Sequence, residues 1–353
     1  MPHAPGHRAD RPTLRDVAKR AAVSAMTVTR VLRDDPRVLP GTRERVLAAV
    51  AELGYRPNTV ARSLRLGRGS GLVGLVVTNL ANPFYSRLAL GVDSVVGPHG
   101  LKTVIGNTRQ DLDVERELVA DLVGRRVDGI IAVPAGTDQR HLAAAVAQGV
   151  PVVCASRPPA GFEADHVLVD DFGGAREATE RLLALGHRRI GFLGPPAAVY
   201  TSTERLRGYR AALEAAGLPA TDDVISQGQQ DIATAERAAA GLLALPAPPT
   251  ALFCSNNRNT IGAFRAVSAA GGDTALAGFD DFELADSLGL PLTIQAYDSD
   301  ELGREAGRLL TDRMRNAPAA GGAPRRTVVP TRAVQYGTPR PARATGGSGT
   351  APA

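Results

Sequence analysis

The sequence predicts a small all-α unit followed by a large two-lobed α/β core with parallel sheets. Two observations lead to this prediction. Residues 13–56 show short apolar helical patterns separated by breaks, whereas from Leu72 onward short apolar runs alternate with helical patterns. Such alternation is typical of parallel sheets that are covered by helices on both faces. With 353 residues, the chain is long enough for one small domain and one or two larger ones.

The segment 13–32, TLRDVAKRAAVSAMTVTRVL, predicts two helices joined by a tight turn. The first has an apolar face at Leu14, Val17 and Ala18. Ser24 is a natural N-cap for the second, because its hydroxyl can accept from a free backbone amide. The apolar face of the second helix is formed by Val28, Val31 and Leu32, and its outward positions are Ala25, Met26, Thr27, Thr29 and Arg30. This arrangement is typical of a helix-turn-helix, in which one helix braces and the other faces the major groove of DNA.

The distribution of charge favours contact with DNA. Up to Ser70 the chain has 14 Lys and Arg residues against 6 Asp and Glu, a net charge of +8, whereas the whole chain carries +5. The remainder therefore carries −3, and the positive excess is confined to one end. Paired amphipathic helices also occur in proteins that never touch DNA, but this confinement is the pattern expected for binding to phosphates.

A third helix is predicted in the segment TRERVLAAVAELGY, with Gly54 as its stop. Asn58 can cap a further short helix over 59–66, and the glycines that follow it mark a linker. Residues 1–12 and 337–353 lack apolar periodicity and are predicted to be disordered tails.

The larger region contains eight predicted strands and eight predicted helices. The strands are expected at 72–77, 102–107, 129–134, 151–156, 166–170, 188–194, 250–256 and 274–280. The helices are expected near 84–97, 113–125, 138–148, 173–185, 203–216, 232–244, 258–270 and 300–315. Crossings between two lobes are expected near 160 and 285–296, where loops interrupt the alternation. A ligand would then bind beyond the carboxyl ends of the strands.

Several classes of protein are not supported by the sequence. It has no apolar run of about 18 residues, so no membrane span is expected, and residues 1–10 lack the apolar core of a secretory signal. Cys154 and Cys254 lie in apolar runs and are expected to be small buried hydrophobes in a cytoplasmic protein, with no disulfide. The six histidines lack metal-ligand spacing, and no G-x-S-x-G, H-E-x-x-H or P-loop motif is present. We therefore expect neither an enzyme nor a bound metal or cofactor.

From Thr13 to about Tyr336 the chain resembles the lactose/galactose repressor (LacI/GalR) family. The motifs are the helix-turn-helix, the third helix, a Gly-Tyr-x-Pro-Asn turn and an Ala-Arg-x-Leu segment. The resemblance implies an all-α helix-turn-helix headpiece plus a hinge helix, followed by a two-lobed α/β periplasmic-binding-protein-like core with parallel sheets. The corresponding domains are 13–57, 58–71 and 72–336.

The resemblance also implies a function. Family members are transcriptional regulators, most often repressors, that bind an approximately palindromic DNA operator as homodimers. A small-molecule effector, a sugar or a related metabolite, binds between the lobes and controls the affinity for the operator. A solute-binding protein without a DNA function is the main alternative, and the basic headpiece argues against it. A dimer is favoured over a tetramer because no terminal leucine heptad is present.

For DNA, the resemblance places Ala25, Met26 and Arg30 against base edges, and Arg30 could bond two acceptors of a guanine. The alternative for Arg30 is a solvated surface charge. The hydroxyl groups expected to contact phosphates are those of Ser24, Thr27 and Thr29. The hinge residues expected at the minor groove are Asn58, Ala61 and Leu64. A leucine there can wedge between base pairs; the alternative for Leu64 is packing against the linker.

For the effector, the resemblance points to Phe84 and Tyr85, to Arg205 and to Asp280. The alternative for the two aromatic residues is a helix start with core aromatics. An arginine fork and a carboxylate that face one cleft are suited to a polyol.

The cleft also departs from the family pattern. The family commonly has Asp-Arg where this chain has Ser156-Arg157, and Asn-Asp where it has Asn256-Asn257. Two carboxylates are thus replaced by neutral groups, Ser156 and Asn257. We infer a cleft of altered polarity, which raises an anionic or less hydroxylated ligand as an alternative to a common hexose.

Two further departures lie in the headpiece. The family usually has glycine in the helix-turn-helix turn, where this chain has Ala22, and a residue with a Cβ is costlier there if φ is positive, by about 1 kcal/mol. The third helix usually follows a serine or threonine cap, where this chain has Leu39. Both departures predict a slightly less stable headpiece.

Overall fold

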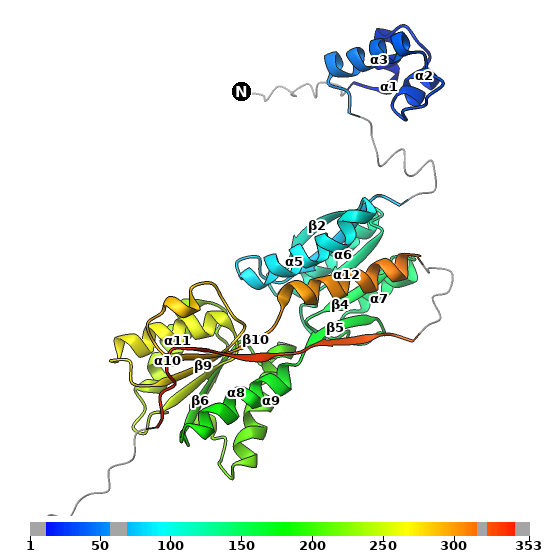
Figure 1. Cartoon of the computed structure of the whole chain (residues 1–353). Coiled ribbons are helices and arrows are strands. Elements are labelled where there is room, and N and C mark those ends of the chain that lie inside the picture. Colours follow the sequence, from blue (N-terminus) through cyan, green and yellow to red (C-terminus); the bar gives the residue numbers. More distant parts are fainter. Residues whose placement is uncertain (1–11, 57–68, 316–322, 343–353) are drawn as a thin grey trace, which may run out of the picture. The chain divides into compact units, whose positions relative to one another are not determined.

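The computed structural model describes residues 12–56, 69–315 and 323–342 (Figure 1). The chain divides between Ser70 and Gly71 into two compact units. The predicted hinge residues Asn58, Ala61 and Leu64 lie outside the described residues and stay predictions.

The headpiece contains the three predicted helices, which are α1 (Leu14–Arg20), α2 (Ala25–Val31) and α3 (Pro40–Leu53). Thr13 and Asp16 cap α1 reciprocally, which holds the pKa of the Asp16 carboxyl below its usual value through the bonds to Thr13. All three helices contribute to a core of buried aliphatic side chains, which are Val17, Ala18, Ala21, Val28, Val31, Val46 and Ala49. This core fixes the angle between α1 and α2.

Both sequence departures in the headpiece have the expected geometry. Ala22 adopts φ 53°, in the left-handed region that favours glycine. Leu39 precedes α3 and provides no side-chain cap. The loss is partly offset because Pro40, at the first position of the helix, has no backbone N–H that would need an acceptor. Gly54, with φ 60°, ends α3 as predicted.

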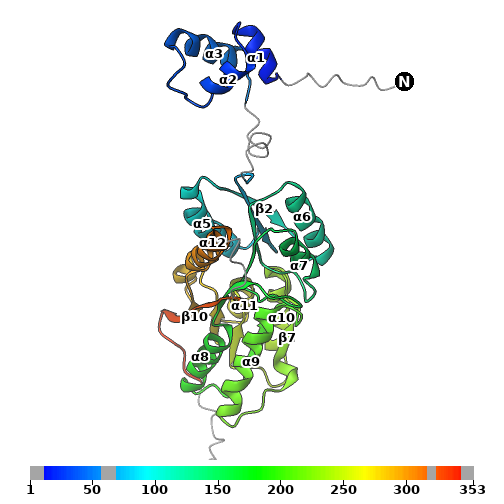
Figure 2. The same ribbon diagram turned by 90° about the vertical axis from the view of Figure 1, so that its right-hand side faces the viewer.

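The first lobe of the larger unit is a six-stranded parallel sheet in the order β11-β5-β4-β3-β1-β2. Its strands are β1 (Leu72–Val77), β2 (Lys102–Asn107), β3 (Gly129–Ala132), β4 (Val152–Ala155), β5 (Asp165–Val169) and β11 (Arg326–Val329). Helices α5 (Pro83–Val96) and α12 (Ser299–Arg315) cover one face, and α6 (Leu112–Gly124) and α7 (Arg140–Ala147) cover the other (Figure 2).

The second lobe has the order β12-β10-β9-β8-β6-β7, with β12 antiparallel to β10 at the edge. Its strands are β6 (Ile190–Gly194), β7 (Ile225–Gln227), β8 (Ala251–Cys254), β9 (Ala275–Phe279), β10 (Leu292–Ala296) and β12 (Arg332–Tyr336). Two packed pairs of helices cover it, α8 (Asp171–Ala184) with α9 (Tyr200–Ala215) and α10 (Ile232–Leu243) with α11 (Asn257–Ala269).

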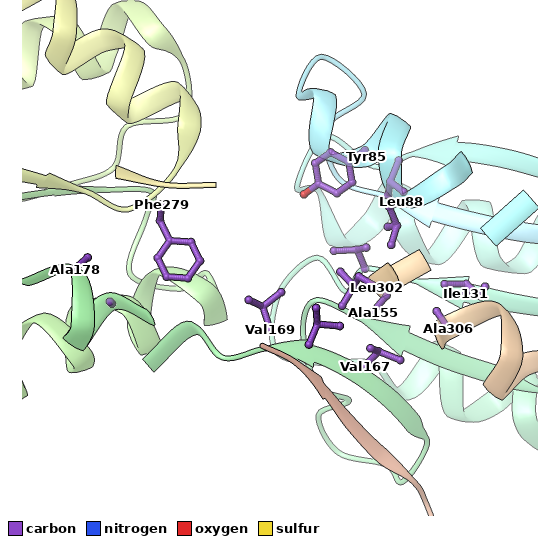
Figure 3. Packing of buried hydrophobic residues seen from close by; sticks show 14 of the residues in the cluster. Tyr85, Leu88, Ile131, Ala155, Val167, Val169, Ala178, Phe279, Leu302 and Ala306 are labelled. Atoms are coloured by element: carbon purple, nitrogen blue, oxygen red, sulfur yellow. The ribbon is translucent and has the colours of Figure 1, made fainter. Parts of the chain in front are cut away.

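An apolar cluster continues from one lobe into the other. Leu88 and Leu302 bring α5 and α12 onto the first sheet, and Val169 and Phe279 extend the cluster toward the second (Figure 3). Short 3-10 turns lie at Gly97–His99, Asp222–Val224 and Ala285–Ser287.

The chain passes between the lobes three times, which corrects the prediction. The first passage is at Asp170, after β5, instead of near 160. The second lies between β10 and α12, so 285–296 is not merely a loop but contains β10. The third, at 330–331, joins β11 to β12. These strands escaped prediction because polar side chains interrupt their apolar pattern, and in β10 Gln295 is buried while its amide donates to Thr331 and Glu177.

The prediction of a disordered tail from 337 is wrong for residues 337–342. The Ala342 amide donates to the Leu185 carbonyl at 2.9 Å, and His187 Nε2 lies 3.0 Å from the Arg340 carbonyl oxygen. Hydrogen bonds to backbone groups of the segment therefore hold it in place, although it has no apolar periodicity.

Candidate functional site

The outward face of α2 presents most of the predicted DNA-contacting residues to solvent. Ala25, Met26 and Arg30 are exposed, and residue Met26 is 63% exposed. In the free protein, this large apolar side chain is left in contact with water. It is therefore suited to an apolar contact with a partner. Among the described residues, the Arg30 guanidinium forms no hydrogen bond or ion pair, and its charge acts on Asp35 without a direct contact, so its donors are open to a partner.

The three hydroxyl groups of this region are partly engaged. Ser24 Oγ accepts from the Thr27 amide at 3.1 Å and lies 2.9 Å from Thr27 Oγ1, as the predicted N-cap. Thr29 Oγ1 donates to the Ala25 carbonyl at 3.0 Å. The Thr29 hydroxyl thus has its proton committed within the helix, and Ser24 and Thr27 are better suited than Thr29 to donate to a phosphate.

A cavity of about 440 Å³ lies where the two sheets face each other. It is lined by residues that directly follow the carboxyl ends of strands in both lobes, as expected for open parallel sheets. These residues include Thr78 after β1, Arg109 and Gln110 close after β2, Ser156 and Arg157 after β4, Ser255 after β8, Asp280 after β9 and Tyr297 after β10.

Six of the seven predicted effector residues line this cavity, namely Phe84, Tyr85, Ser156, Arg157, Arg205 and Asp280. Two of them, Ser156 and Asp280, have left-handed backbones with φ 64° and 65°. Non-glycine residues in this region store strain, and such strain concentrates at ligand sites.

The seventh, Asn257, does not line the cavity but joins the lobes. Its Nδ2 donates to Asn82 Oδ1 at 3.0 Å, and Asn82 Nδ2 donates to Asn257 Oδ1 at 3.2 Å. Asn257 begins α11 in the second lobe, and Asn82 caps α5 in the first. The pair is a reciprocal amide bridge between the lobes, and Asn257 is buried in it.

Arg205 forms a compact ionic cluster in the second lobe. Its Nε donates to Asp171 Oδ1 at 2.7 Å, Nη2 lies 3.1 Å from Asp280 Oδ1, and Nη1 donates to the Ser255 carbonyl at 2.5 Å. The guanidinium also stacks 3.7 Å above the centre of the Phe279 ring. The buried Arg205 cation therefore has carboxylate partners within the protein, Asp171 and Asp280.

Burial is the main cause of the altered pKa of Asp171. It raises the pKa of this carboxyl to about 7, although the neighbouring Arg205 acts in the opposite direction. Burial likewise raises the pKa of the Tyr297 hydroxyl well above its usual value.

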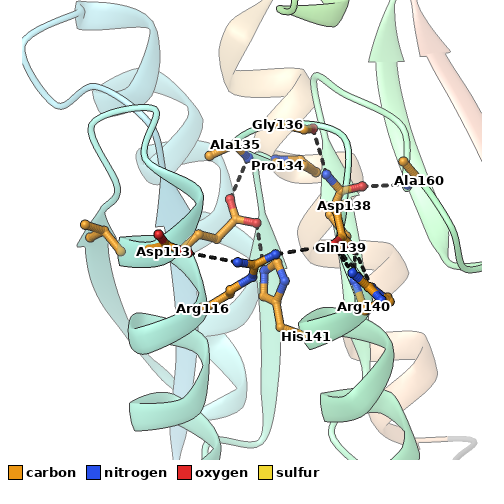
Figure 4. A network of polar contacts seen from close by, with 12 residues as sticks. Asp113, Arg116, Pro134, Ala135, Gly136, Asp138, Gln139, Arg140, His141 and Ala160 are labelled. Atoms are coloured by element: carbon orange, nitrogen blue, oxygen red, sulfur yellow. Dashed lines mark hydrogen bonds and ion pairs between the residues drawn. The ribbon is translucent and has the colours of Figure 1, made fainter.

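Arg157 is as buried as Arg205 but has different partners. It is 6% exposed, and its Nη1 donates to Gln110 Oε1 at 2.8 Å and to the Pro134 carbonyl at 2.7 Å. Both acceptors are neutral, and Nε has no acceptor within the described part of the chain. The loop that contains Pro134 and Ala135 is shown in Figure 4. It is held in place because the buried Glu115 accepts from the Ala135 amide at 2.6 Å.

Aromatic rings from the two lobes lie next to one another at the cavity. The Tyr297 ring lies 6.2 Å from the Phe84 ring and 6.1 Å from the Phe279 ring. Tyr85 is only 7% exposed and its hydroxyl bonds Thr78, so it serves the core as well as the cavity wall. Phe84 is the predicted aromatic that offers the more accessible ring.

Sequence reasoning missed Arg109, Gln110, Arg258 and Tyr297 among the lining residues. The signal was present, since Arg109 and Gln110 lie just beyond a predicted strand and Arg258 opens a predicted helix. The side-chain directions that bring these residues to one cavity depend on backbone geometry, including φ 55° and 65° at Arg109 and Gln110.

Both cysteines are free and buried as predicted, and burial raises their pKa values. Within the described ranges, no group of three or more His, Cys, Asp or Glu residues could hold a metal ion. No described helix is both long enough and apolar enough to span a bilayer.

Comparison with known proteins gives two family matches. Residues 13–58 match the model of the bacterial regulatory proteins of the lacI family. Residues 70–336 match the model of the periplasmic binding proteins and sugar binding domain of the LacI family.

Individual proteins agree with these matches. The HTH-type transcriptional regulator CelR of Thermobifida fusca is 36% identical over 318 residues, which cover 87% of this chain and 93% of that protein. A structure of a CelR–cellobiose complex is similar with a TM-score of 0.67 and 33% identity, over 92% of this chain and 99% of that one. The lac repressor dimer bound to operator and the anti-inducer ONPF gives a TM-score of 0.76 at 26% identity, over 92% and 98% of the two chains.

Proposed function

Since the chain belongs to the LacI family of bacterial regulatory proteins, we propose that its α2 helix reads an operator and that a small molecule in the inter-lobe cleft controls this binding. The chain is thus a DNA-binding transcriptional regulator rather than a protein that only binds a solute. The observation that carries the proposal is the combination, in one chain, of an exposed helix-turn-helix surface and a polar cavity between two lobes.

At the DNA, Arg30 is the residue that we propose for reading a base. Its free guanidinium can donate two bonds to guanine O6 and N7. Ala25 and Met26 offer apolar surface to a thymine methyl group, and Ser24 and Thr27 can position the helix on phosphates. The excess of positive charge up to Ser70 supplies affinity that falls steeply with salt.

We propose that the protein acts as a homodimer on an approximately palindromic site. A pair of identical headpieces reads two half-sites related by a two-fold axis, so the operator mirrors the symmetry of the protein. The hinge residues Asn58, Ala61 and Leu64 would meet the minor groove between the half-sites.

In the cleft, an effector that contacts both lobes would favour the closed arrangement over the open one. Phe84 offers an aromatic face for the CH groups of a sugar, and Arg205 and Asp280 offer a donor fork and an acceptor. The cellobiose complex of the related CelR supports a sugar-like effector. Because the effector binds the two arrangements with different affinity, it changes the population that is competent for DNA.

The test is selection of DNA sequences by the purified full chain, followed by binding measurements at several salt concentrations. Arg30→Ala should weaken binding to the selected site by about 1–3 kcal/mol and relax the preference at one base position. The matched control is Arg210→Ala in the second lobe, which should change neither. Selection of the same sequence, with the same affinity, by the Arg30→Ala variant would refute the assignment.

A further inference from the structure

We propose that the effector of the inter-lobe cleft carries an anionic group, a carboxylate or a phosphate, on a hydroxylated scaffold. This inference rests on the proposed function, because it concerns the ligand of the same cleft. It starts from an imbalance of charge among the lining residues, which include four arginines, Arg109, Arg157, Arg205 and Arg258, but only one carboxylate, Asp280.

Arg205 does not contribute to the imbalance. The two carboxylates in contact with it, Asp171 and Asp280, compensate its charge within the protein. Asp280 pairs with Arg205 and, among the described residues, forms no ion pair within 4.0 Å with Arg109, Arg157 or Arg258.

Arg157 is a buried cation at the wall of the cavity. It is more than nine-tenths buried and lines the cavity, yet its hydrogen-bond acceptors in the described residues are the neutral oxygens of Gln110 and Pro134. Its neighbour Ser156 also lines the cavity and brings no charge. A buried cation without a counterion is costly, because it has lost water without gaining an opposite charge. An anion in the cavity removes this cost.

Arg109 and Arg258 flank the same cavity from opposite lobes. Neither forms an ion pair within 4.0 Å in the described part of the chain, although the charge of Arg258 acts on Asp231 without a direct contact. An anionic group held near Arg157 would therefore be attracted by a cation from each lobe, and it would favour their approach. A neutral sugar can accept hydrogen bonds from the same groups but cannot offset their charge.

The geometry divides the cavity into two kinds of surface. The anion would lie by Arg157, where the donor groups lack acidic partners. The hydroxylated part would lie by Phe84 and Asp280, where a ring face and a carboxylate are available. Carboxylate and phosphate share the chemistry that this arrangement recognises, and the experiment below distinguishes them.

The test is calorimetric titration of the full chain with D-glucose, cellobiose, D-glucuronate, D-glucose 6-phosphate and inorganic phosphate at constant ionic strength. The affinity for at least one of the anions should be at least about ten times higher than the affinity for the neutral sugars. The better of glucuronate and glucose 6-phosphate identifies the class of anionic group.

Arg157→Gln should reduce the affinity for the anion by roughly 10- to 100-fold, the loss expected for a hydrogen bond to a charged group. The affinity for neutral sugars should fall by a smaller factor, because a hydrogen bond to a neutral acceptor contributes less. A second variant combines Arg109→Gln with Arg258→Gln. These side chains brace no loop, so their loss should not disturb folding, and the double substitution should also reduce the affinity for the anion. Arg210→Gln, remote from the cavity, is the matched control.

Two results would overturn the proposal: neutral sugars that bind as tightly as the anions, or anion binding that is absent or survives both variants. Binding of operator DNA by the same preparation, without any effector, is measured in parallel. Loss of that binding counts against the proposed function. If DNA binding is intact and neutral sugars bind as tightly as the anions, the result counts against the anionic effector alone.

Discussion

The left-handed backbone at Ala22 predicts that Ala22→Gly stabilises the headpiece. Ala22 lies in the turn between α1 and α2 with φ 53°, and it is exposed, so the substitution removes a Cβ without emptying any part of the core. The hydrogen bond from its amide to the Lys19 carbonyl, 3.3 Å long, does not depend on the side chain.

The magnitude follows from two opposing contributions. A left-handed conformation costs an L-residue roughly 1–2 kcal/mol, and glycine avoids this cost. Glycine also gives the unfolded chain more freedom, which offsets about 0.4–1 kcal/mol of the gain. We therefore expect the free energy of opening of the headpiece to rise by about 0.5–1 kcal/mol, that is about 2- to 5-fold slower exchange of its amides.

Amide hydrogen exchange of the full chain, read by mass spectrometry over peptides from 13–56, measures this free energy separately from that of the core. The matched control is Ala51→Gly, the same chemical change on the exposed face of α3. There, glycine should destabilise by about 1 kcal/mol. Equal effects of the two variants, or faster exchange in Ala22→Gly, would refute the reasoning about backbone strain.

Two further predictions concern the larger unit. Because the pKa of Asp171 is raised to about 7 in the folded protein, its proton is bound more tightly there than in the unfolded chain, so the associated stability is present below about pH 4 and is lost as the pH rises to about 7. Urea unfolding between pH 5 and pH 8 should show a decline that is smaller in Asp171→Asn, and an equal decline would contradict the assignment. Asn257→Ala removes both hydrogen bonds of the bridge to Asn82, each of which contributes about 0.5–1.5 kcal/mol. Without ligand, the lobes of this variant should therefore open further. X-ray scattering should then give a larger radius of gyration than for the control Asn256→Ala.

Much of the architecture could be predicted because its signals are local. Each buried parallel strand is a nearly continuous apolar run, such as 72–77, and each helix between strands has its own period. The N-cap at Ser24 and the strain at Ala22 were also predictable, since both depend on a few neighbouring residues.

The parts that escaped prediction depend on contacts far apart in the sequence. Strand β10 contains the polar residues Thr293 and Gln295, whose donor groups are tolerated in the interior because Gln335 of β12 accepts from Thr293, and Glu177 and Thr331 accept from the Gln295 amide. The sequence motif predicts that Asn257 contacts the ligand, but its amide donates to Asn82, which is 175 residues away. No local pattern reports such a partner.

The short third passage between the lobes determines how they can move. Only Pro330 and Thr331 separate β11 from β12, and three Cα–Cα steps span at most about 11 Å. The Asp170 amide is also bonded to the Val329 carbonyl at 3.1 Å, which ties a second passage to the same edge. The lobes cannot separate there, so opening is a rotation whose pivot lies at this edge. Displacement should increase across each sheet toward β2 and β7, where a pair of spectroscopic labels would record the largest change in distance.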